Sequence, residues 1–216
     1  MQILKTIYDK DIFLDKDFDI IKDYKIRPTV KVVLIDENNK VCLLKARGHY
    51  LLPGGGVEKI NDVYENLESA LRREIREEAG CEIKDIAEVG IVEQYRDGLE
   101  SHPKIKTTDN DNNSSKNKAI STKYIVYFYK AKVDDNKGLP TSTQEDELQG
   151  IEICWLDRRE VIEIFAKQND VIDEGEYAFC FNTRSHYEAI KKAFEIWVEN
   201  VIIYIIWILI KIHQSI

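Results

Sequence analysis

Apolar residues recur along this chain in two spacings, one typical of strands and one typical of helices. Short β-branched runs bounded by turn residues predict strands. The first two runs are TVKVVLID and VCLLKA, which begin at Thr29 and Val41 and are separated by the turn sequence ENNK. Together they predict a β-hairpin. Later runs predict strands over Ile86–Tyr95, Lys123–Val133 and Ile151–Leu156.

Helical spacing of apolar residues occurs in three regions. In the first, Leu67 and Leu71 share one face of a predicted helix that ends near Gly80, a residue type typical of helix C-caps. A second helix is predicted from about Arg158 to Lys167, after the last strand. A third is predicted from about Arg184, as an amphipathic helix packed on the domain.

The first helix carries three glutamates on its apolar side. On an ideal helix that turns about 100° per residue, Glu77 lies about 60° to one side of Glu74 and Glu78 about 40° to the other. Leu67 and Leu71 lie in the same sector. A merely solvated acidic face would point away from the leucines, and like charges at neighbouring helix positions repel each other. The pattern therefore indicates a bound cation, and such oxygen ligands suit Mg²⁺, with Mn²⁺ as a substitute.

A glycine turn precedes this helix, and the whole segment is LPGGGVEKINDVYENLESALRREIREEAGC. It resembles the Nudix box, the signature of pyrophosphohydrolases that act on a nucleoside diphosphate linked to another moiety. The family pattern is G-x5-E-x7-R-E-U-x-E-E-x-G-U, where U is apolar, and the chain follows it from Glu65 to Cys81. Nine residues rather than five separate Gly55 from Glu65. We therefore expect an insertion of four residues within Lys59–Tyr64.

The resemblance implies an α/β fold, a Nudix-like α/β/α sandwich with a mixed β-sheet. It implies a metal-dependent enzyme that splits a phosphoanhydride, with the metal held by Glu74, Glu77, Glu78 and the carbonyl group of Gly55. It implies catalytic roles for Glu77, Glu78 and Arg73, and for Glu145 or Glu147 in a later loop, where a carboxylate often supplies a metal ligand or the general base. It implies substrate binding at Gly54, Gly55 and Gly56, and a role for Glu65 and Arg73 in orienting the site.

Three regions follow from this interpretation. Residues 1–27 form an N-terminal extension, expected to pack as a strand or hairpin at the edge of the domain. Residues 28–167 form the Nudix hydrolase domain. They include the polar segment 97–122, which we expect to be a surface loop rather than a lid over the substrate. Residues 168–216 form a C-terminal helical extension with an apolar tail.

The tail contains an uninterrupted apolar run over Val201–Ile210. This run is about half of the roughly 20 residues needed to span a bilayer. A buried terminal element or a contact in a homodimer is favoured over a membrane anchor.

Composition restricts the partners. The net charge is −8 and the pI is about 5.2, which argues against a nucleic-acid backbone as the main ligand. A small nucleotide-like phosphorylated substrate is compatible with this charge. The four cysteines are scattered singly, without the close pairs of zinc sites, and are expected to be reduced core residues. No secretory leader pattern opens the chain, so we expect a cytoplasmic protein.

Two other functions fit parts of the pattern. A Nudix-like module that binds a nucleotide as a sensor or interaction domain, without hydrolysis, would share the fold. A purely structural helix would leave the glutamates aligned with leucines unexplained. The sequence does not select among nucleoside triphosphates, nucleotide sugars, ADP-ribose and dinucleoside polyphosphates as substrate.

Overall fold

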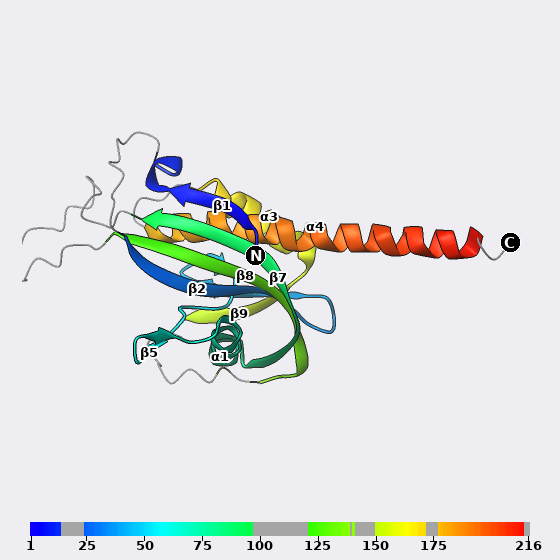
Figure 1. The fold of residues 1–216 in the computed structure, drawn as a ribbon, viewed down its shortest axis with the longest axis horizontal. Coiled ribbons are helices and arrows are strands. Elements are labelled where there is room, and N and C mark those ends of the chain that lie inside the picture. Colours follow the sequence, from blue (N-terminus) through cyan, green and yellow to red (C-terminus); the bar gives the residue numbers. More distant parts are fainter. Residues whose placement is uncertain (14–23, 97–120, 139, 141–149, 172–176, 214–216) are drawn as a thin grey trace, which may run out of the picture.

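A mixed β-sheet of seven strands organises the chain (Figure 1). The computed structural model describes residues 1–13, 24–96, 121–138, 140, 150–171 and 177–213, and only the backbone of 135–137 and 196–213. The strands follow the order β1 (Ile3–Tyr8), β7 (Cys81–Arg96), β8 (Thr122–Lys137), β2 (Lys25–Ile35), β3 (Val41–Ala46) and β4 (His49–Leu51), and β9 (Ile151–Leu156) pairs with β3.

Parallel and antiparallel pairs both occur in this sheet. Strand β1 runs parallel to β7 and strand β2 parallel to β8, whereas the other pairs are antiparallel. The predicted mixed sheet is therefore confirmed, as are the predicted hairpin of β2 and β3 and the expected strand at the domain edge, β1. Strand β2 begins at Lys25, earlier than predicted, because Lys25 already pairs with Thr122 of β8.

Helices cover both faces of the sheet (Figure 1). Helix α1 (Leu67–Ala79) lies on one face, and α3 (Arg158–Asn169) and α4 (Tyr177–His213) lie on the other. Alternate residues of β2 divide between the two layers, as the period of a strand requires. Val32 packs in a cluster that contains Ile75 of α1, and Val33 packs in a cluster that contains Phe165 of α3.

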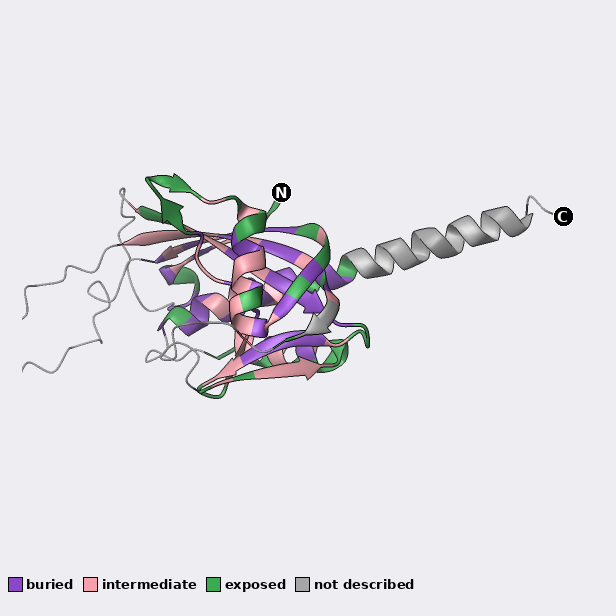
Figure 2. Cartoon of the chain, turned by 90° about the horizontal axis from the view of Figure 1, so that it is seen from below, coloured by how far each residue is buried: buried purple, intermediate pink, exposed green. Residues whose placement is uncertain are grey.

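This arrangement confirms the predicted α/β/α sandwich. Figure 2 shows buried residues along the strands of the sheet. The buried residues Leu71 and Ile75 of α1 and Phe165 of α3 pack in clusters with residues of the sheet. Each layer has its own apolar core, so the sheet is a rigid platform for whatever its loops carry.

Helix α1 has well-defined ends. At its start, the side chain of Asn66 accepts hydrogen bonds from the backbone N–H of Glu68 (2.9 Å) and of Ser69 (3.4 Å). At its end, Gly80 adopts a left-handed conformation with φ of 64°, as predicted for a C-cap. These caps fix where the glutamates of α1 lie along the helix.

Helix α4 begins at Tyr177, earlier than the predicted start near Arg184. Its first turns carry buried Phe179 and Phe181, which belong to the domain rather than to an appended element. Among the described residues, no helix is long and apolar enough to cross a membrane. The side chains of the predicted apolar tail, Val201–Ile210, lie outside the described residues.

None of the four cysteines forms a disulfide. Cys42, Cys81 and Cys180 are buried, as predicted, whereas Cys154 on β9 is partly exposed. Burial raises the pKa of the Cys154 thiol, and the negative charge of Glu152 adds to this effect. The loops predicted over 97–122 and 138–150 fall largely outside the described part of the chain.

Candidate functional site

The glycine turn lies against β2 like a short extra strand. The backbone N–H of Val30 donates to the carbonyl oxygen of Gly55 (2.9 Å), and Val57 N–H donates to the Pro28 carbonyl (3.1 Å). Val32 N–H donates to the carbonyl of Pro53 at 3.1 Å. The turn is therefore held by the sheet on one side, and its other side is available to α1.

Gly54 connects this turn to α1. Its backbone N–H donates to the Glu78 carboxylate at 2.5 Å, and its carbonyl oxygen accepts a hydrogen bond from the Lys31 ammonium group. Gly54 has φ of 120°, and an added Cβ would overlap the Val30 carbonyl. Only glycine fits here without strain.

Gly55 leaves room for a second carboxylate. A Cβ on Gly55 would overlap the carboxylate of Glu74, whereas a Cβ on Gly56 would meet nothing closer than Arg27, at 3.7 Å. Glu74 and Glu78 therefore both reach the turn from α1, and the side chain of Glu74 is only 12% exposed.

Arg73 forms hydrogen bonds with three acidic side chains and with the turn. Its Nη1 donates to Glu74 (2.9 Å) and Glu77 (3.0 Å), and its Nη2 donates to Glu65 (2.8 Å) and to the Gly56 carbonyl (3.0 Å). Its Nε is buried and has no acceptor among the described residues. Arg73 was predicted to orient the site, and these contacts place it between α1 and the turn.

The insertion in the box forms a small β-hairpin. Strands β5 (Lys59–Ile60) and β6 (Val63–Tyr64) pair across a turn at Asn61 and Asp62, which both have positive φ. At the base of the hairpin, Glu65 N–H donates to the Glu58 carbonyl (3.0 Å), and Glu58 N–H donates to the Glu65 carboxylate (2.8 Å). The extra residues therefore project outwards, and Glu65 still reaches Arg73.

Burial and charge act differently on two of these carboxyl groups. Burial raises the pKa of Glu74, and the neighbouring charge of Glu78 raises it further, against the opposing effect of Arg73 and Lys31. At Glu65, burial alone would raise the pKa, but hydrogen bonds from Arg73 and from Glu58 N–H outweigh it and lower the pKa. At Glu74, the positive charges of Arg73 and Lys31 do not offset burial and the charge of Glu78. At Glu65, the hydrogen bonds offset burial.

These residues suit a hard divalent ion. Carboxylates and backbone carbonyls are the oxygen ligands that Mg²⁺ prefers, and a cation between Glu74 and Glu78 would offset the repulsion that raises the Glu74 pKa. Among the described residues, no three acidic, histidine or cysteine side chains meet closely enough to hold a metal ion. Arg73 bonds to both Glu74 and Glu77, so an ion at this site would compete with Arg73 for the Glu77 carboxylate.

The predicted site residues fall into two groups. The structure brings together Glu74, Glu77, Glu78, Arg73, Glu65, Gly54, Gly55 and Gly56. Glu145 and Glu147 lie outside the described residues. The Gly55 carbonyl, predicted as a metal ligand, accepts a bond from Val30.

Lys31 was missed by the sequence analysis. It interrupts an otherwise apolar strand, TVKVVLI, and a lysine inside such a run is a signal that could have found it. Its ammonium group lies at the Gly54 carbonyl and lowers the pKa of Glu74. The turn therefore already has one positive charge beside it.

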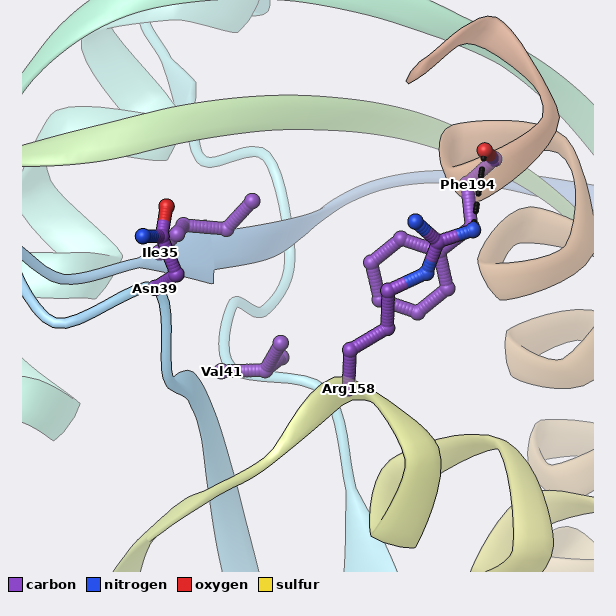
Figure 3. A pocket seen from close by; sticks show the side chains of 5 residues that line it. All are labelled: Ile35, Asn39, Val41, Arg158 and Phe194. Carbon is purple, nitrogen blue, oxygen red and sulfur yellow. Dashed lines mark hydrogen bonds between the residues drawn. The ribbon is translucent and has the colours of Figure 1, made fainter. Parts of the chain in front are cut away.

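A separate cavity of about 210 Å³ lies between the β2–β3 turn, α3 and α4 (Figure 3). Its lining residues are Ile35, Asn39, Val41, Arg158 and Phe194. Arg158 donates to the Phe194 carbonyl at 3.2 Å and covers the Phe194 ring. None of the carboxylates described above lines this cavity, so the glycine turn and α1 define the candidate site.

The sequence profile of the NUDIX domain matches residues 25–176 of this chain. The chain belongs to the NUDIX family. The chain is also similar to a solved structure of the mutator MutT protein from Bacillus halodurans, with 21% identity, a TM-score of 0.44, and coverage of 64% of this chain and 72% of that chain. The family match spans the glycine turn, α1 and Arg73. It confirms the predicted enzyme class, a Nudix-type hydrolase acting on phosphoanhydride bonds.

Proposed function

We propose that this NUDIX protein is a metal-dependent pyrophosphohydrolase that cleaves a phosphoanhydride in a nucleoside diphosphate linked to another moiety. The observation that carries the proposal is the pairing of the glycine turn with α1. There, Gly54 N–H bonds to Glu78, and Gly55 leaves space for the largely covered side chain of Glu74.

Glu74, Glu78 and a carbonyl of the turn would hold the divalent ion, Mg²⁺ or Mn²⁺, and Glu77 would join them after releasing Arg73. A bound divalent ion neutralises charge that develops on the phosphate oxygens and makes a water molecule more acidic. Because Gly54 and Gly55 carry no side chains, the carboxylates of Glu78 and Glu74 lie directly against the turn, and an ion held between them would lie close to its backbone. Lys31 adds positive charge at the same point.

Arg73 would position the carboxylates rather than react. Its guanidinium joins Glu65 at the base of the hairpin to Glu74 on α1, and this fixes the distance between turn and helix. The proton of the attacking water has to pass to a carboxylate. Glu145 and Glu147 remain the predicted candidates for this role, and Glu77, whose side chain is 39% exposed, is the most accessible of the described glutamates that hydrogen-bond to Arg73.

Composition and the cysteines bear on the substrate and on the cellular location. The acidic composition favours a small nucleotide-like ligand over nucleic acid. Free cysteines fit a reducing compartment such as the cytoplasm. A homodimer stays a prediction.

The test is a panel of nucleoside triphosphates, nucleotide sugars, ADP-ribose and dinucleoside polyphosphates with Mg²⁺. We expect Glu77→Gln and Glu78→Gln to lower kcat by roughly 100-fold or more on whichever substrate the parent hydrolyses. Glu68→Gln is the matched control, because Glu68 lies on the same helix and pairs with Arg72 on its exposed side. Equal turnover by all variants would remove the proposed metal site. Nucleotide binding by the parent without turnover would favour the sensor alternative.

A further inference from the structure

Basic side chains line the α4 side of the sheet next to the glycine turn. Arg27 on β2 occupies the same strand face as Val33, which packs in the core beneath α3 and α4. Arg96, the last residue of β7, lies across from Thr122 of β8, on the α4 side. Both guanidinium groups lie over the ring of Tyr124, Arg96 at 4.2 Å from its centroid and Arg27 at 5.8 Å.

Arg96 is buried, and no carboxylate of a described residue forms an ion pair with it. It is 9% exposed, it also lies 5.0 Å from the Phe181 ring, and its hydrogen bonds within the described residues go to the amide oxygens of Gln94 and Asn182. Buried arginines are usually paired with an acid. The charge of Asp9 raises the pKa of Arg96, and the Asp9 carboxylate accepts a hydrogen bond from Tyr177.

The charge of Arg96 persists at neutral pH. Burial lowers its pKa to about 10, and the nearby charge of Arg27 lowers it as well. Because this value lies well above 7, the guanidinium stays protonated. The ring of Tyr124 thus has a fixed positive charge against it, in a region of low dielectric where such charge attracts anions strongly.

Arg27 is the accessible member of this group. Its side chain is exposed, and no ion pair with a described residue holds it. A Cβ on Gly56 would lie 3.7 Å from its Nη2 and 3.9 Å from its Nε. The exposed guanidinium therefore adjoins the turn at which Glu74 and Glu78 meet.

We propose that Arg27, backed by Tyr124 and Arg96, is a binding subsite for a phosphate group that the substrate carries in addition to the diphosphate held at the glycine turn. The inference rests on the proposed function and narrows its substrate class. A guanidinium fork matches two phosphate oxygens, and no described carboxylate competes for Arg27. The additional phosphate extends the polyphosphate chain or sits on a ribose.

Kinetics of Arg27→Gln test the subsite. Three comparisons are made. A nucleoside triphosphate carries a third phosphate in the chain, ADP-ribose carries a neutral moiety beyond the diphosphate, and NADP differs from NAD by a phosphate on a ribose. We expect the parent to prefer one phosphate-bearing substrate. Arg27→Gln should lower kcat/KM for it about tenfold, through KM, and leave the substrates without the additional phosphate unchanged.

Lys25→Gln is the matched control, since Lys25 is exposed on the same strand and the change removes the same charge. An equal effect of Arg27→Gln on all substrates, or an equal effect of Lys25→Gln, would overturn the subsite. The subsite would also be overturned if the parent preferred ADP-ribose and Arg27→Gln changed no kinetic constant. The proposed hydrolase activity would then still hold.

Binding without turnover separates this inference from the catalytic proposal. Inorganic tripolyphosphate is titrated calorimetrically into the protein in EDTA, so that neither metal nor hydrolysis contributes. We expect Arg27→Gln to weaken binding about tenfold and Lys25→Gln to change it little. Equal affinity in the parent and in Arg27→Gln would refute the subsite even for an active hydrolase.

Tyr124 is a positioning residue in this proposal. Tyr124→Phe keeps the ring under both guanidinium groups and should retain the parent KM for the phosphate-bearing substrate. Tyr124→Leu removes the ring and should raise that KM with kcat unchanged, in protein whose thermal unfolding shows a native fold. A Tyr124→Leu variant with the parent KM, or a fall in kcat alone, would contradict this role.

Discussion

At the scale of single residues, one arginine compensates several acidic groups. Arg73 bonds to Glu65, Glu74 and Glu77, and Glu78 adds a further negative charge next to Glu74. Without Arg73, these carboxylates would repel one another in a partly buried site, which costs more than the loss of a surface ion pair. Arg73 therefore stabilises the metal-free protein and, if the proposed function holds, competes with the metal for Glu77.

Replacing Arg73 tests this balance. We expect Arg73→Met to lower the free energy of unfolding by about 2 kcal/mol, since charged hydrogen bonds to Glu65 and Glu74 are lost. Added Mg²⁺ should recover part of that loss by supplying positive charge. Arg72→Met is the control, because Arg72 pairs with Glu68 near the surface and should cost less. Urea unfolding with and without Mg²⁺ measures both, and equal losses in the two variants would contradict the central role of Arg73.

Two adjacent glycines make a sharper test of the turn. Alanine at position 55 would push its Cβ into the Glu74 carboxylate, whereas position 56 has space for it. Because small displacements of catalytic groups cost much rate, we expect Gly55→Ala to lower kcat about 100-fold and Gly56→Ala to stay near the parent. Steady-state kinetics of both variants on the best substrate of the parent measure this difference. If Gly55→Ala is as active as Gly56→Ala, Glu74 does not need its observed position.

The raised pKa of Glu74 predicts how metal binding depends on pH. Burial and then Glu78 raise this pKa, so in the metal-free protein ionisation of Glu74 opposes folding, and stability falls as pH rises through the raised value. Mg²⁺ requires the ionised form and should stabilise more near neutral pH than near pH 5. At about 100 times its dissociation constant, Mg²⁺ adds about 2.7 kcal/mol to the free energy of unfolding.

Thermal unfolding with Mg²⁺ or with EDTA, at both pH values, measures this effect. Glu74→Gln carries no titrating proton and should lose most of the Mg²⁺ stabilisation at either pH. If Mg²⁺ stabilised the parent protein equally at both pH values, Glu74 would not be a ligand of the metal.

The sequence predicted the residues of the site through a local rule and missed those that depend on distant contacts. Helix geometry predicted that Glu74, Glu77 and Glu78 share one side of the helix; in the structure Glu74 and Glu78 reach the turn, and Glu77 bonds to Arg73. Lys31 and Arg96 were not predicted, because each acquires its neighbours from elements far away in the chain: Gly54 for Lys31, and Phe181 of α4 for Arg96. Spacing along one element carries no information about such partners.

At the scale of secondary-structure elements, the hairpin β5–β6 explains why the box accepts an insertion. Its strands and turn are exposed, and Tyr64 donates a long hydrogen bond to the Ile26 carbonyl (3.3 Å). Reciprocal bonds between Glu58 and Glu65 close its base. The sequence located the extra residues within Lys59–Tyr64 but not their conformation, which depends on the positive φ of Asn61 and Asp62.

Shortening this hairpin tests whether it matters to the site. Replacing the four residues Ile60–Val63 by Asn-Gly keeps the Lys59–Tyr64 pair as the closing pair of a two-residue turn. We expect stability within about 1 kcal/mol of the parent, since little buried area is lost, and a kcat close to the parent value. Urea unfolding and steady-state kinetics measure these quantities. A large fall in kcat at unchanged stability would assign the hairpin a direct part in the reaction.

At the scale of the whole molecule, the core extends beyond the segment that matches the NUDIX profile. That match ends at residue 176, yet α4 begins at Tyr177 and buries Phe181, Ile190 and Phe194 in the same cluster as Val33. The sequence predicted β9 to the residue and the start of β8 within one residue, because each is a compact apolar run, but it ended β8 at Val133, whereas the strand continues through polar residues to Lys137. It placed the start of α4 too late, because a cluster of aromatic residues hides the helical period.

Truncation at two positions therefore has opposite expected results. A chain that ends at residue 176 keeps the whole profile match but loses Phe179, Phe181, Ile190 and Phe194 from the core. Burying four such side chains contributes about 6–12 kcal/mol, which is comparable to the entire net stability of a domain, about 5–15 kcal/mol. We expect this chain to unfold, with no cooperative thermal transition in circular dichroism.

A chain that ends at Glu195 retains every described core residue and should melt cooperatively near the parent temperature. If the shorter chain also folds, α4 packs on the NUDIX domain but is not required for its hydrophobic core.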